Sequence, residues 1–355
     1  MRSLRLSTGY MVFFLLGSMP FGMRPGFAQE LGIKVKKPVL GAACKSCPWG
    51  ALGDIVKEAL QPYGYDVQIC YNCWRADAPK IVADASMPPS LANNTNQLPA
   101  YLVPPPPNAP VEFGVTAAQF LQDAYQGNRE YAGEKPRKNL RLLANIQAPM
   151  YVIVAAKSSF GITGLRQIKE KLWPVRIIAF GDEAMDILAY YGLTKQSIEA
   201  AGGKVGGAEG PEGQDLRNNF DVIIHYGTLA NTPEFNVWYE VSEKYDLTYL
   251  ELPNDLLAKL AKDYSMERGT IPVSLLRGVN RPIPTVVRLG TVVYGRADMP
   301  NDFAYTVAKA LDEHQNLLRW ALLPLSYDWR TVWKSGDVPL HPGAARYYKE
   351  ARLMK

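Results

Sequence analysis

Histidine is scarce in this sequence, with three among 355 residues, and neither a Ser/His/Asp group nor a pair of carboxylates stands out. That scarcity argues against an enzyme that works by general acid–base or nucleophilic catalysis. Basic residues form no concentrated block, so we expect no nucleic-acid partner. No long apolar run follows residue 28, and we therefore expect a soluble chain without a membrane-spanning helix.

The first 28 residues have the pattern of a secretory signal peptide. Arg2 and Arg5 precede a short apolar stretch, Tyr10–Leu16, and Gly26-Phe27-Ala28 places small residues where a signal peptidase cleaves. We expect the mature chain to begin near Gln29 and to lie in the periplasm. Its formal charge would fall from +5 to +2, because the segment carries three arginines and no acid.

The body of the chain alternates strand-like and helix-like stretches, which predicts an α/β protein. Residues 50–63, for example, have apolar side chains at helical spacing, Gly64 ends that helix, and residues 65–69 form the next strand. Two lobes with mixed, mostly parallel sheets fit the length, at ~100–200 residues per domain. We expect residues 29–148 and 280–355 in lobe I and residues 149–279 in lobe II, with a ligand cleft between them.

A proline-rich insertion, residues 86–110, interrupts lobe I between its second and third strands. It is unsuited to a sheet interior and favours extended polyproline conformation. It is either a passive surface loop or a lid or docking arm. Further along the chain, the pattern predicts one long strand over residues 284–294 and one long helix over residues 301–322.

All four cysteines fall in two CxxC pairs, Cys44/Cys47 and Cys70/Cys73, each at the end of a predicted strand. Three interpretations fit this spacing. Structural disulfides suit an exported protein, a four-thiolate metal site suits paired CxxC motifs, and a redox-active thiol suits a cysteine ahead of a helix. Because neighbouring strands lie ~4.8 Å apart, we expect the two pairs to lie within reach of each other.

The loops after the first two strands and the start of one second-lobe helix are the candidate walls of the cleft. Lys45 or Arg75 on lobe I would pair with a carboxylate, or else is solvated surface charge. The helix beginning at Gly181-Asp182-Glu183 offers free N–H groups to an anion, although Asp182 also suits an N-cap. The other candidate ligand-binding residues are Ser46, Trp49, Tyr71, Asn72, Trp74, Thr116, His225 and Tyr226.

The C-terminal stretch Val338-Pro339-Leu340-His341-Pro342-Gly343-Ala344-Ala345-Arg346-Tyr347-Tyr348-Lys349-Glu350 resembles the signature of one family, the TAXI solute-binding proteins of TRAP transporters. In physical terms, His-Pro-Gly is a turn and the two tyrosines suit the packing face of a helix. Segments of similar resemblance, in the same order, are residues 111–127, 181–194 and 298–305.

The resemblance implies a two-lobed, type II periplasmic-binding-protein fold that closes over a small, usually carboxylate-bearing solute. It implies delivery to TRAP-type membrane subunits, with no cofactor and no catalysis, and we expect a monomer. The family's usual Gly/Thr/Ser-rich loops are replaced here by residues 44–49 and 70–75, so its usual ligand does not carry over. The alternative is a periplasmic metal-binding or thiol-redox protein that uses the CxxC pairs on the same scaffold.

Overall fold

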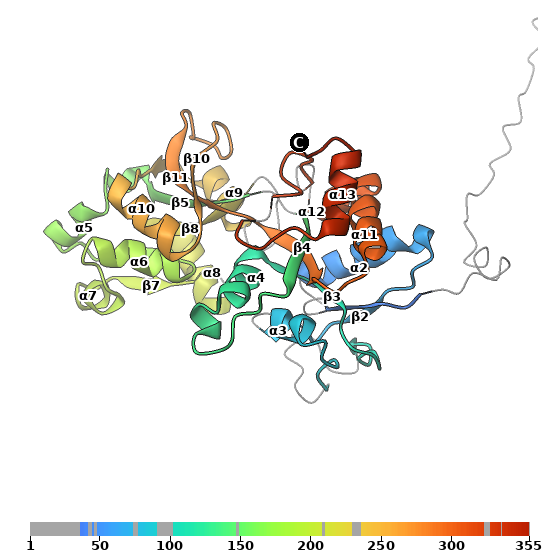
Figure 1. Cartoon of the computed structure of the whole chain (residues 1–355). Coiled ribbons are helices and arrows are strands. Elements are labelled where there is room, and N and C mark those ends of the chain that lie inside the picture. The colour runs from blue at the N-terminus through green and yellow to red at the C-terminus, as the bar shows by residue number, and fades with distance from the viewer. Residues whose placement is uncertain are drawn as a thin grey trace, which may run out of the picture. The chain divides into compact units, whose positions relative to one another are not determined.

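The computed structural model contains two mixed β-sheets with helices on both faces of each, and Lys36–Lys355 forms one compact unit (Figure 1). We call the part built on one sheet the first lobe and the part built on the other the second lobe. The structure describes residues 36–41, 45, 48–73, 77–90, 102–146, 149–207, 210–228, 236–322, 327–334 and 336–354.

The sheet of the first lobe has the strand order β2-β1-β3-β12-β4. Its members are β1 (Val39–Gly41), β2 (Gln68–Cys70), β3 (Phe113–Ala117), β4 (Leu140–Asn145) and β12 (Thr291–Arg296). Strand β1 runs parallel to β2 and β3, whereas β12 runs antiparallel to both β3 and β4. The carboxyl ends of β1, β2 and β3 therefore meet at one edge of the sheet.

Helices cover both faces of this sheet because its strands present buried apolar side chains on both sides. One face packs against α2 (Pro48–Leu60), α11 (Asn301–Glu313), α12 (Gln315–Leu322) and α13 (Pro342–Glu350). The other face packs against α3 (Asp77–Ala83) and α4 (Ala118–Gln126). Helix α2 is followed by the 3-10 turn η1 (Gln61–Tyr63), which ends at Gly64 with a φ of 82°, as the sequence predicted for this glycine.

The second lobe is built on the sheet β10-β11-β5-β8-β6-β7, with β9 also paired to β5. Its strands are β5 (Met150–Lys157), β6 (Arg176–Ala179), β7 (Lys204–Gly206), β8 (Val222–Thr228), β9 (Leu247–Tyr249), β10 (Glu267–Ile271) and β11 (Ile283–Arg288). The strand pairs β6–β7 and β6–β8 are parallel, and the other pairs are antiparallel. Antiparallel pairs are therefore more numerous than the sequence pattern led us to expect.

The helices of the second lobe also divide between two apolar clusters, one on each face of the sheet. One cluster includes α5 (Arg166–Lys171), α6 (Asp182–Tyr190), α7 (Lys195–Ala200) and α10 (Asn254–Asp263). The other includes α8 (Gly210–Asn219) and α9 (Asn236–Lys244), where Trp238 is fully buried. Each lobe thus has its own core.

The chain passes between the two sheets at two places that lie side by side. Residues 146–149 lead from β4 to β5, and residues 289–290 lead from β11 to β12. Met150 pairs with Arg288, so both crossings start from the same end of the second sheet. The sequence predicted one strand over residues 284–294 and a return to lobe I at residue 280. Instead, residues 283–288 belong to the second sheet, and the chain enters the first sheet only at Thr291.

The long C-terminal helix expected over residues 301–322 is two helices, α11 and α12, separated at His314. His314 caps α11 with φ −113° and ψ 28°. Nearby, the Asp312 carboxylate accepts hydrogen bonds from Tyr327 (2.9 Å) and Tyr347 (2.6 Å). These bonds attach the end of α11 to α13 and to the segment that precedes it.

The C-terminal motif forms the start of α13. The Nδ1 atom of His341 accepts a hydrogen bond from the Gly343 N–H (3.1 Å), so His341 is the N-cap of the helix, and Pro342 occupies its first position. Tyr348 donates to the Leu143 carbonyl (2.8 Å) from a fully buried position. The structural role predicted for His341 and for the tyrosines is confirmed.

Candidate functional site

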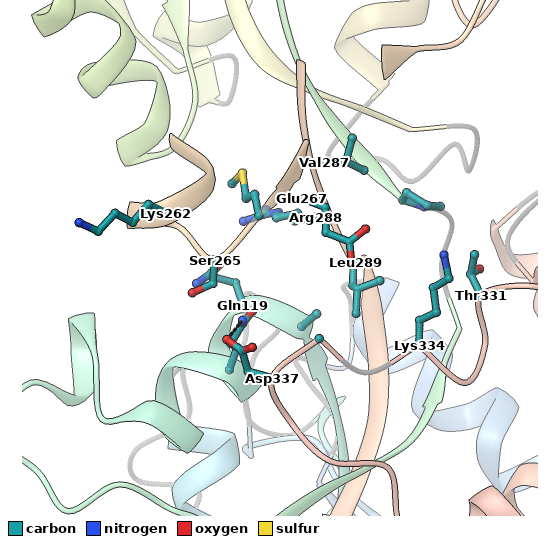
Figure 2. Close-up of a pocket in the computed structure, with 15 residues that line it drawn as sticks. Gln119, Lys262, Ser265, Glu267, Val287, Arg288, Leu289, Thr331, Lys334 and Asp337 are labelled. Atoms are coloured by element: carbon teal, nitrogen blue, oxygen red, sulfur yellow. Dashed lines mark hydrogen bonds between the residues drawn. The ribbon is translucent and has the colours of Figure 1, made fainter. Parts of the chain in front are cut away.

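A cavity of about 390 Å³ lies where the chain crosses between the lobes (Figure 2). We call it the inter-lobe cavity, because α4 and the C-terminal segment line it from the first lobe, and the α10–β10 turn and the end of β11 line it from the second. Its lining residues are Ala118, Gln119, Gln122, Pro149, Lys262, Ser265, Met266, Glu267, Val287, Arg288, Leu289, Thr331, Lys334, Gly336 and Asp337. The volume is in the range of small-molecule sites.

The lining contains three cations and two carboxylates, and these five charged groups differ in how far they are buried. Lys262, Glu267, Lys334 and Asp337 are exposed, whereas the side chain of Arg288 is 16% exposed. The exposed charges interact with bulk water and are screened by salt, so they select ligands weakly. Arg288 is the cation of this cavity that burial shields from solvent.

Arg288 is the last residue of β11, where pairing with Met150 holds its backbone. Its guanidinium carbon lies 3.8 Å from the centroid of the Tyr226 ring, a cation–π contact. Its Nη1 atom lies 3.8 Å from Oε1 of Glu183, which is an ion pair without a hydrogen bond. The Nε atom is buried and has no hydrogen-bond partner among the described residues.

On the other side of the cavity, Asp337 is attached to α4. Its Oδ2 atom accepts hydrogen bonds from Gln122 (3.0 Å) and Gln126 (2.6 Å). These amides place the C-terminal segment against the helix that begins at the end of β3. The carboxylate is therefore positioned at the cavity wall by two neutral hydrogen-bond donors.

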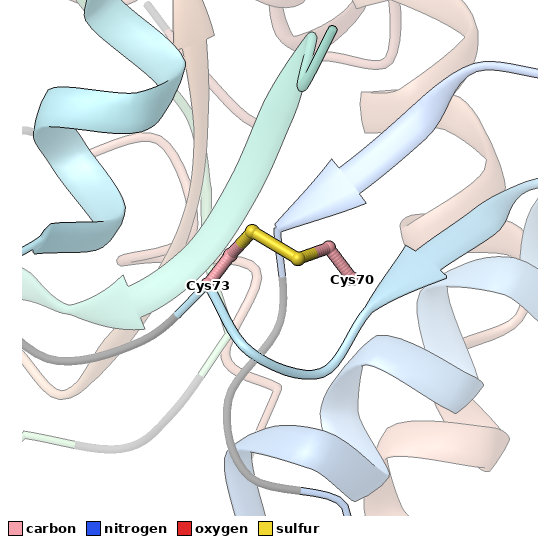
Figure 3. Close-up of a disulfide and its surroundings, with 2 residues drawn as sticks. All are labelled: Cys70 and Cys73. Atoms are coloured by element: carbon pink, nitrogen blue, oxygen red, sulfur yellow. A yellow bond between two sulfur atoms is a disulfide. The ribbon is translucent and has the colours of Figure 1, made fainter. Parts of the chain in front are cut away.

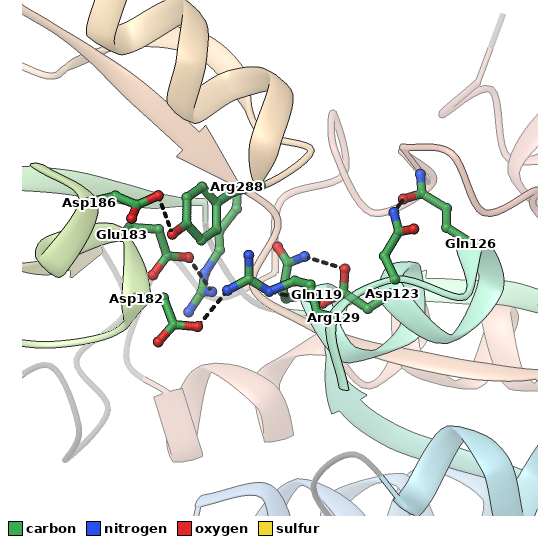
Figure 4. Close-up of polar contacts among 10 residues, drawn as sticks. Gln119, Asp123, Gln126, Arg129, Asp182, Glu183, Asp186 and Arg288 are labelled. Carbon is green, nitrogen blue, oxygen red and sulfur yellow. Dashed lines mark hydrogen bonds and ion pairs between the residues drawn. The ribbon is translucent and has the colours of Figure 1, made fainter. Parts of the chain in front are cut away.

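A second group of polar residues joins the lobes beside the cavity (Figure 4). Arg129, in the first lobe at the start of η4 (Arg129–Tyr131), donates from Nη2 to Oδ2 of Asp182 at 2.6 Å. Its guanidinium also lies 4.4 Å from the centroid of the Tyr264 ring in the second lobe. Tyr264 in turn donates to Asp186 at 2.9 Å. Arg129 thus contacts the first turn of α6 and the end of α10 together.

Asp123 on α4 lies behind Arg129, with 2% of the residue exposed. Its Oδ1 atom accepts from Gln119 (2.9 Å), and its Oδ2 atom lies 3.9 Å from Nε of Arg129. Burial raises the pKa of Asp123 to about 6, although the Gln119 hydrogen bond and the nearby arginines oppose the shift. A buried carboxylate therefore lies within the contact between the lobes.

The predicted anion site at the start of α6 is occupied by the chain's own acids. The N-cap of α6 is Gly181, with a φ of 82°, so the N-cap role considered for Asp182 is wrong. Asp182 is the first helical residue and pairs with Arg129, while Glu183 is buried and faces Arg288. A glycine suits this cap because its φ is strained for other residues. A ligand carboxylate here would compete with two charges already placed.

Lys45 and Tyr71, predicted to contact ligand from lobe I, are joined to each other. Lys45 donates to the Tyr71 hydroxyl (2.9 Å) and to Asp54 (3.3 Å), and Tyr71 donates to Asp54 (2.5 Å). Burial lowers the pKa of Lys45, but its hydrogen bond to Tyr71 and the charge of Asp54 outweigh that effect and raise it. Lys45 is therefore positioned by its neighbours as a protonated amine. Asn72 is buried in the same loop.

Three other predicted site residues are buried inside the lobes. Thr116 on β3 is 1% exposed, and its hydroxyl oxygen has no hydrogen-bond partner among the described residues. His225 on β8 stacks on Phe180 with ring centroids 4.5 Å apart, and burial lowers its pKa to about 4. Tyr226 meets Arg288 through its ring. Of these three, Tyr226 is the one that contacts a residue of the inter-lobe cavity.

Cys70 and Cys73 form a disulfide with Cα atoms 5.6 Å apart, and both residues are fully buried (Figure 3). The bond lies within one CxxC motif at the carboxyl end of β2. It excludes a disulfide from either cysteine to the other motif, and it leaves neither sulfur as a thiolate for a metal. Among the described residues, no group of three or more His, Cys, Asp or Glu side chains is arranged to hold a metal ion.

Several predicted positions lie outside the described residues. These are Cys44, Ser46, Cys47, Trp74 and Arg75, the side chain of Trp49, and the expected signal peptide over residues 1–28. The proline-rich insertion is described at both ends, where the Val111 N–H donates to the Ser86 carbonyl (2.9 Å). In the part of the chain that the structure describes, no helix has both the length and the apolar character needed to span a bilayer.

The sequence analysis missed Arg129 and Arg288. The sequence contained one signal for Arg288. This arginine follows the apolar residues Val286-Val287 and precedes Leu289-Gly290, which is the pattern of a charged residue at the end of a strand rather than in a core. Arg129 carried no such signal. It has a φ of 52°, and its partner Asp182 is distant in the sequence, so only the fold brings the two together.

The solved structures that this chain matches share about a tenth of its sequence. MatC from Rhodopseudomonas palustris with bound malate is 11% identical, with a TM-score of 0.43, over 82% of this chain and 89% of that chain. Rpa4515 from R. palustris with adipate is 11% identical, with a TM-score of 0.41, over 90% and 97%. Lactococcal OpuAC complexed with glycine betaine is 11% identical, with a TM-score of 0.38, over 81% and 99%.

The fold and the cavity define an α/β protein of two mixed-sheet lobes, with a polar cavity at the crossings between them. The chain belongs to the NMT1-like family, whose model matches residues 107–351. That match includes every lining residue of the inter-lobe cavity.

Proposed function

We propose that this protein is an extracytoplasmic solute receptor that captures a small anionic or zwitterionic solute and delivers it to a membrane transporter. The inter-lobe cavity carries the proposal. Its lining comes from both lobes, so one bound solute would contact both and favour the closed arrangement. Small-molecule sites often lie between two domains, and such a site can bind a solute without catalysing a reaction.

The composition of the lining supports a charged, hydrophilic solute. A partly buried arginine, two lysines, two carboxylates and several amide and hydroxyl groups surround about 390 Å³. A purely apolar ligand would leave these groups without partners, which is costly when they lose water. A small organic acid or amino-acid-like solute satisfies more of them.

The narrower assignment, a TAXI-type subunit of a TRAP transporter, comes from the resemblance of residues 338–350. The docking of α13 on α11 gives the residues of that motif a packing role. The residues of this motif therefore pack and cap a helix rather than contact the ligand. The predicted periplasmic location, the monomeric state and the ligand contacts at Lys45 and Arg75 belong to the same proposal.

The direct test is a thermal-shift screen of the mature protein against organic acids, amino acids and neutral sugars, followed by calorimetry on the hits. Ala118→Trp fills one wall of the cavity, and Ala189→Trp makes the same change at an exposed position of α6. We expect the first variant to weaken binding at least ~10-fold and the second to leave it unchanged. Equal binding by both variants would place the solute elsewhere, and no hit in any class would overturn the receptor assignment.

A further inference from the structure

We propose that Arg288 is the carboxylate-binding residue of this receptor and selects small hydrophilic carboxylic acids. This inference rests on the proposed function and narrows it to one ligand group and one protein residue. The sequence placed the ligand-binding cations at Lys45 and Arg75, in loops of the first lobe. The structure places a different cation at the cavity that both lobes line.

Arg288 belongs to a β-strand rather than to a loop, so hydrogen-bonded strand pairing fixes the position of its backbone. It is the last residue of β11, pairs with Met150, and lies three residues before the chain enters the first sheet at Thr291. Pro149 and Leu289, one from each crossing, line the cavity with it. A strand end at the junction of two sheets positions its side chain more precisely than a loop would, which suits a ligand-binding group.

The hydrogen-bonding state of Arg288 differs from that of the two arginines with similar burial and an ion-pair partner. Arg137 and Arg296 have side chains 15% and 18% exposed, and they donate to Glu134 and Asp298, respectively, at 2.9 Å. Arg288 is 16% exposed, and its guanidinium donates no hydrogen bond to any residue in the described ranges. A guanidinium has five N–H donors, and a shielded one without acceptors carries a desolvation cost.

The neighbours of Arg288 contact its guanidinium but accept no hydrogen bond from it. The Tyr226 ring packs on it at 3.8 Å, and Glu183 lies at the same distance, beyond hydrogen-bond length. Arg288 is one of the residues that line the cavity, whereas Tyr226 and Glu183 are not. This arrangement fixes the plane of the fork and leaves N–H groups for a ligand, as a bidentate carboxylate requires.

The other residues that line the cavity indicate which kind of carboxylic acid would bind. Gln119, Gln122, Ser265 and Thr331 offer neutral hydrogen-bonding groups, and the charges at the exposed positions are of both signs. A small acid with further hydroxyl, amide or amino groups would use these contacts. A long fatty acid would exceed the cavity of about 390 Å³ and would leave the polar groups unpaired.

The test compares acids with their amides in calorimetry: lactate with lactamide, succinate with succinamide, and glutarate with glutaramide. Each pair has nearly the same shape and differs in the charge that Arg288 would bind. The variants are Arg288→Gln and Arg288→Lys. The matched control is Arg281→Gln, which removes an exposed arginine just before the same strand.

We expect at least one of these acids to bind the wild type, and each amide to bind at least ~10-fold more weakly than its acid. Arg288→Gln should lose ~10- to 100-fold in affinity for the acid, Arg288→Lys less, and Arg281→Gln nothing measurable. The lysine variant retains the charge and guards against a failure of Arg288→Gln to fold, which circular dichroism would reveal.

Equal affinity of an acid for the wild type and for folded Arg288→Gln would overturn this inference. Tight binding of an amide or a neutral solute, unaffected by either variant, would also overturn it while leaving the receptor function intact. Failure of every acid, amide and sugar to bind the wild type would count against the receptor function itself.

Discussion

The Nη2 atom of Arg129 lies 2.6 Å from Oδ2 of Asp182, and this hydrogen-bonded ion pair joins the first lobe to the second. Asp182 is 80% exposed, so the pair alone is worth little, roughly 0–1 kcal/mol. The stacking of the same guanidinium on Tyr264 adds about 0.5–1 kcal/mol. Together these contacts favour the arrangement in which the lobes meet.

Arg129→Gln should therefore shift the ligand-free protein toward an open arrangement by about 0.5–2 kcal/mol. In small-angle scattering, we expect a larger radius of gyration without ligand and recovery when a ligand is added. Arg346→Gln is the control, because it removes an ion pair with Asp302 (2.9 Å) inside the first lobe. Identical scattering from wild type and Arg129→Gln would show that these contacts do not influence closure.

Asp123 should make the protein more stable as the pH falls toward 4. Its pKa in the folded state is about 6, raised from the ordinary value of 3.8 by burial, so the folded state binds the proton more tightly than the unfolded chain does. The gain appears as the pH drops through 6 and is complete below 3.8. Asp123→Asn should raise the free energy of unfolding at pH 7 by about 1–3 kcal/mol and remove this gain. Urea unfolding at neutral and acidic pH measures both effects.

His225 should act in the opposite direction. Burial lowers its pKa to about 4 from the ordinary 6.5, so the folded state favours the neutral ring. Its contribution to stability is fully present above pH 6.5 and is lost as the pH falls toward 4. His225→Phe keeps a ring against Phe180 but removes the titration, so its unfolding energy should fall less with acid than that of the wild type. An unchanged pH profile in this variant would contradict the assignment.

Gly343 allows α13 to approach α11. A Cβ at this position would lie 2.1 Å from the backbone oxygen of Asn301, so the two helices would have to separate. We expect Gly343→Ala to lower the free energy of unfolding by about 2–3 kcal/mol, measured by chemical denaturation. At Gly164 a Cβ would meet nothing within 4 Å, so Gly164→Ala should change stability by less than ~0.5 kcal/mol. Similar effects from the two substitutions would refute the close-approach argument.

The Cys70–Cys73 disulfide closes a very short loop, so it should stabilise the protein modestly. The chain-entropy relation gives about 2 kcal/mol for such a loop, at the low end of the usual range. Cys70→Ala/Cys73→Ala should lower the unfolding free energy by that amount, when made in a background that lacks Cys44 and Cys47 so that thiols cannot exchange. No loss of stability in this variant would mean that the bond is dispensable for folding.

The sequence by itself determined the elements, because their signals are local. Helical spacing within residues 50–63, a glycine at position 64 and alternation of strands with helices are read over a few turns of chain, and the structure confirms them. The packing role of the C-terminal motif was also readable, since His-Pro-Gly and two adjacent tyrosines suit a capped helix with one buried face.

The tertiary structure alone decided the pairings between distant residues. It set β12 antiparallel to β3 and β4, and it divided the expected strand over residues 284–294 between two sheets. It also brought Arg129 to Asp182 and left Arg288 without a hydrogen-bonding acceptor. No local pattern encodes these relationships, because each depends on where the two sheets place residues that are far apart in the chain.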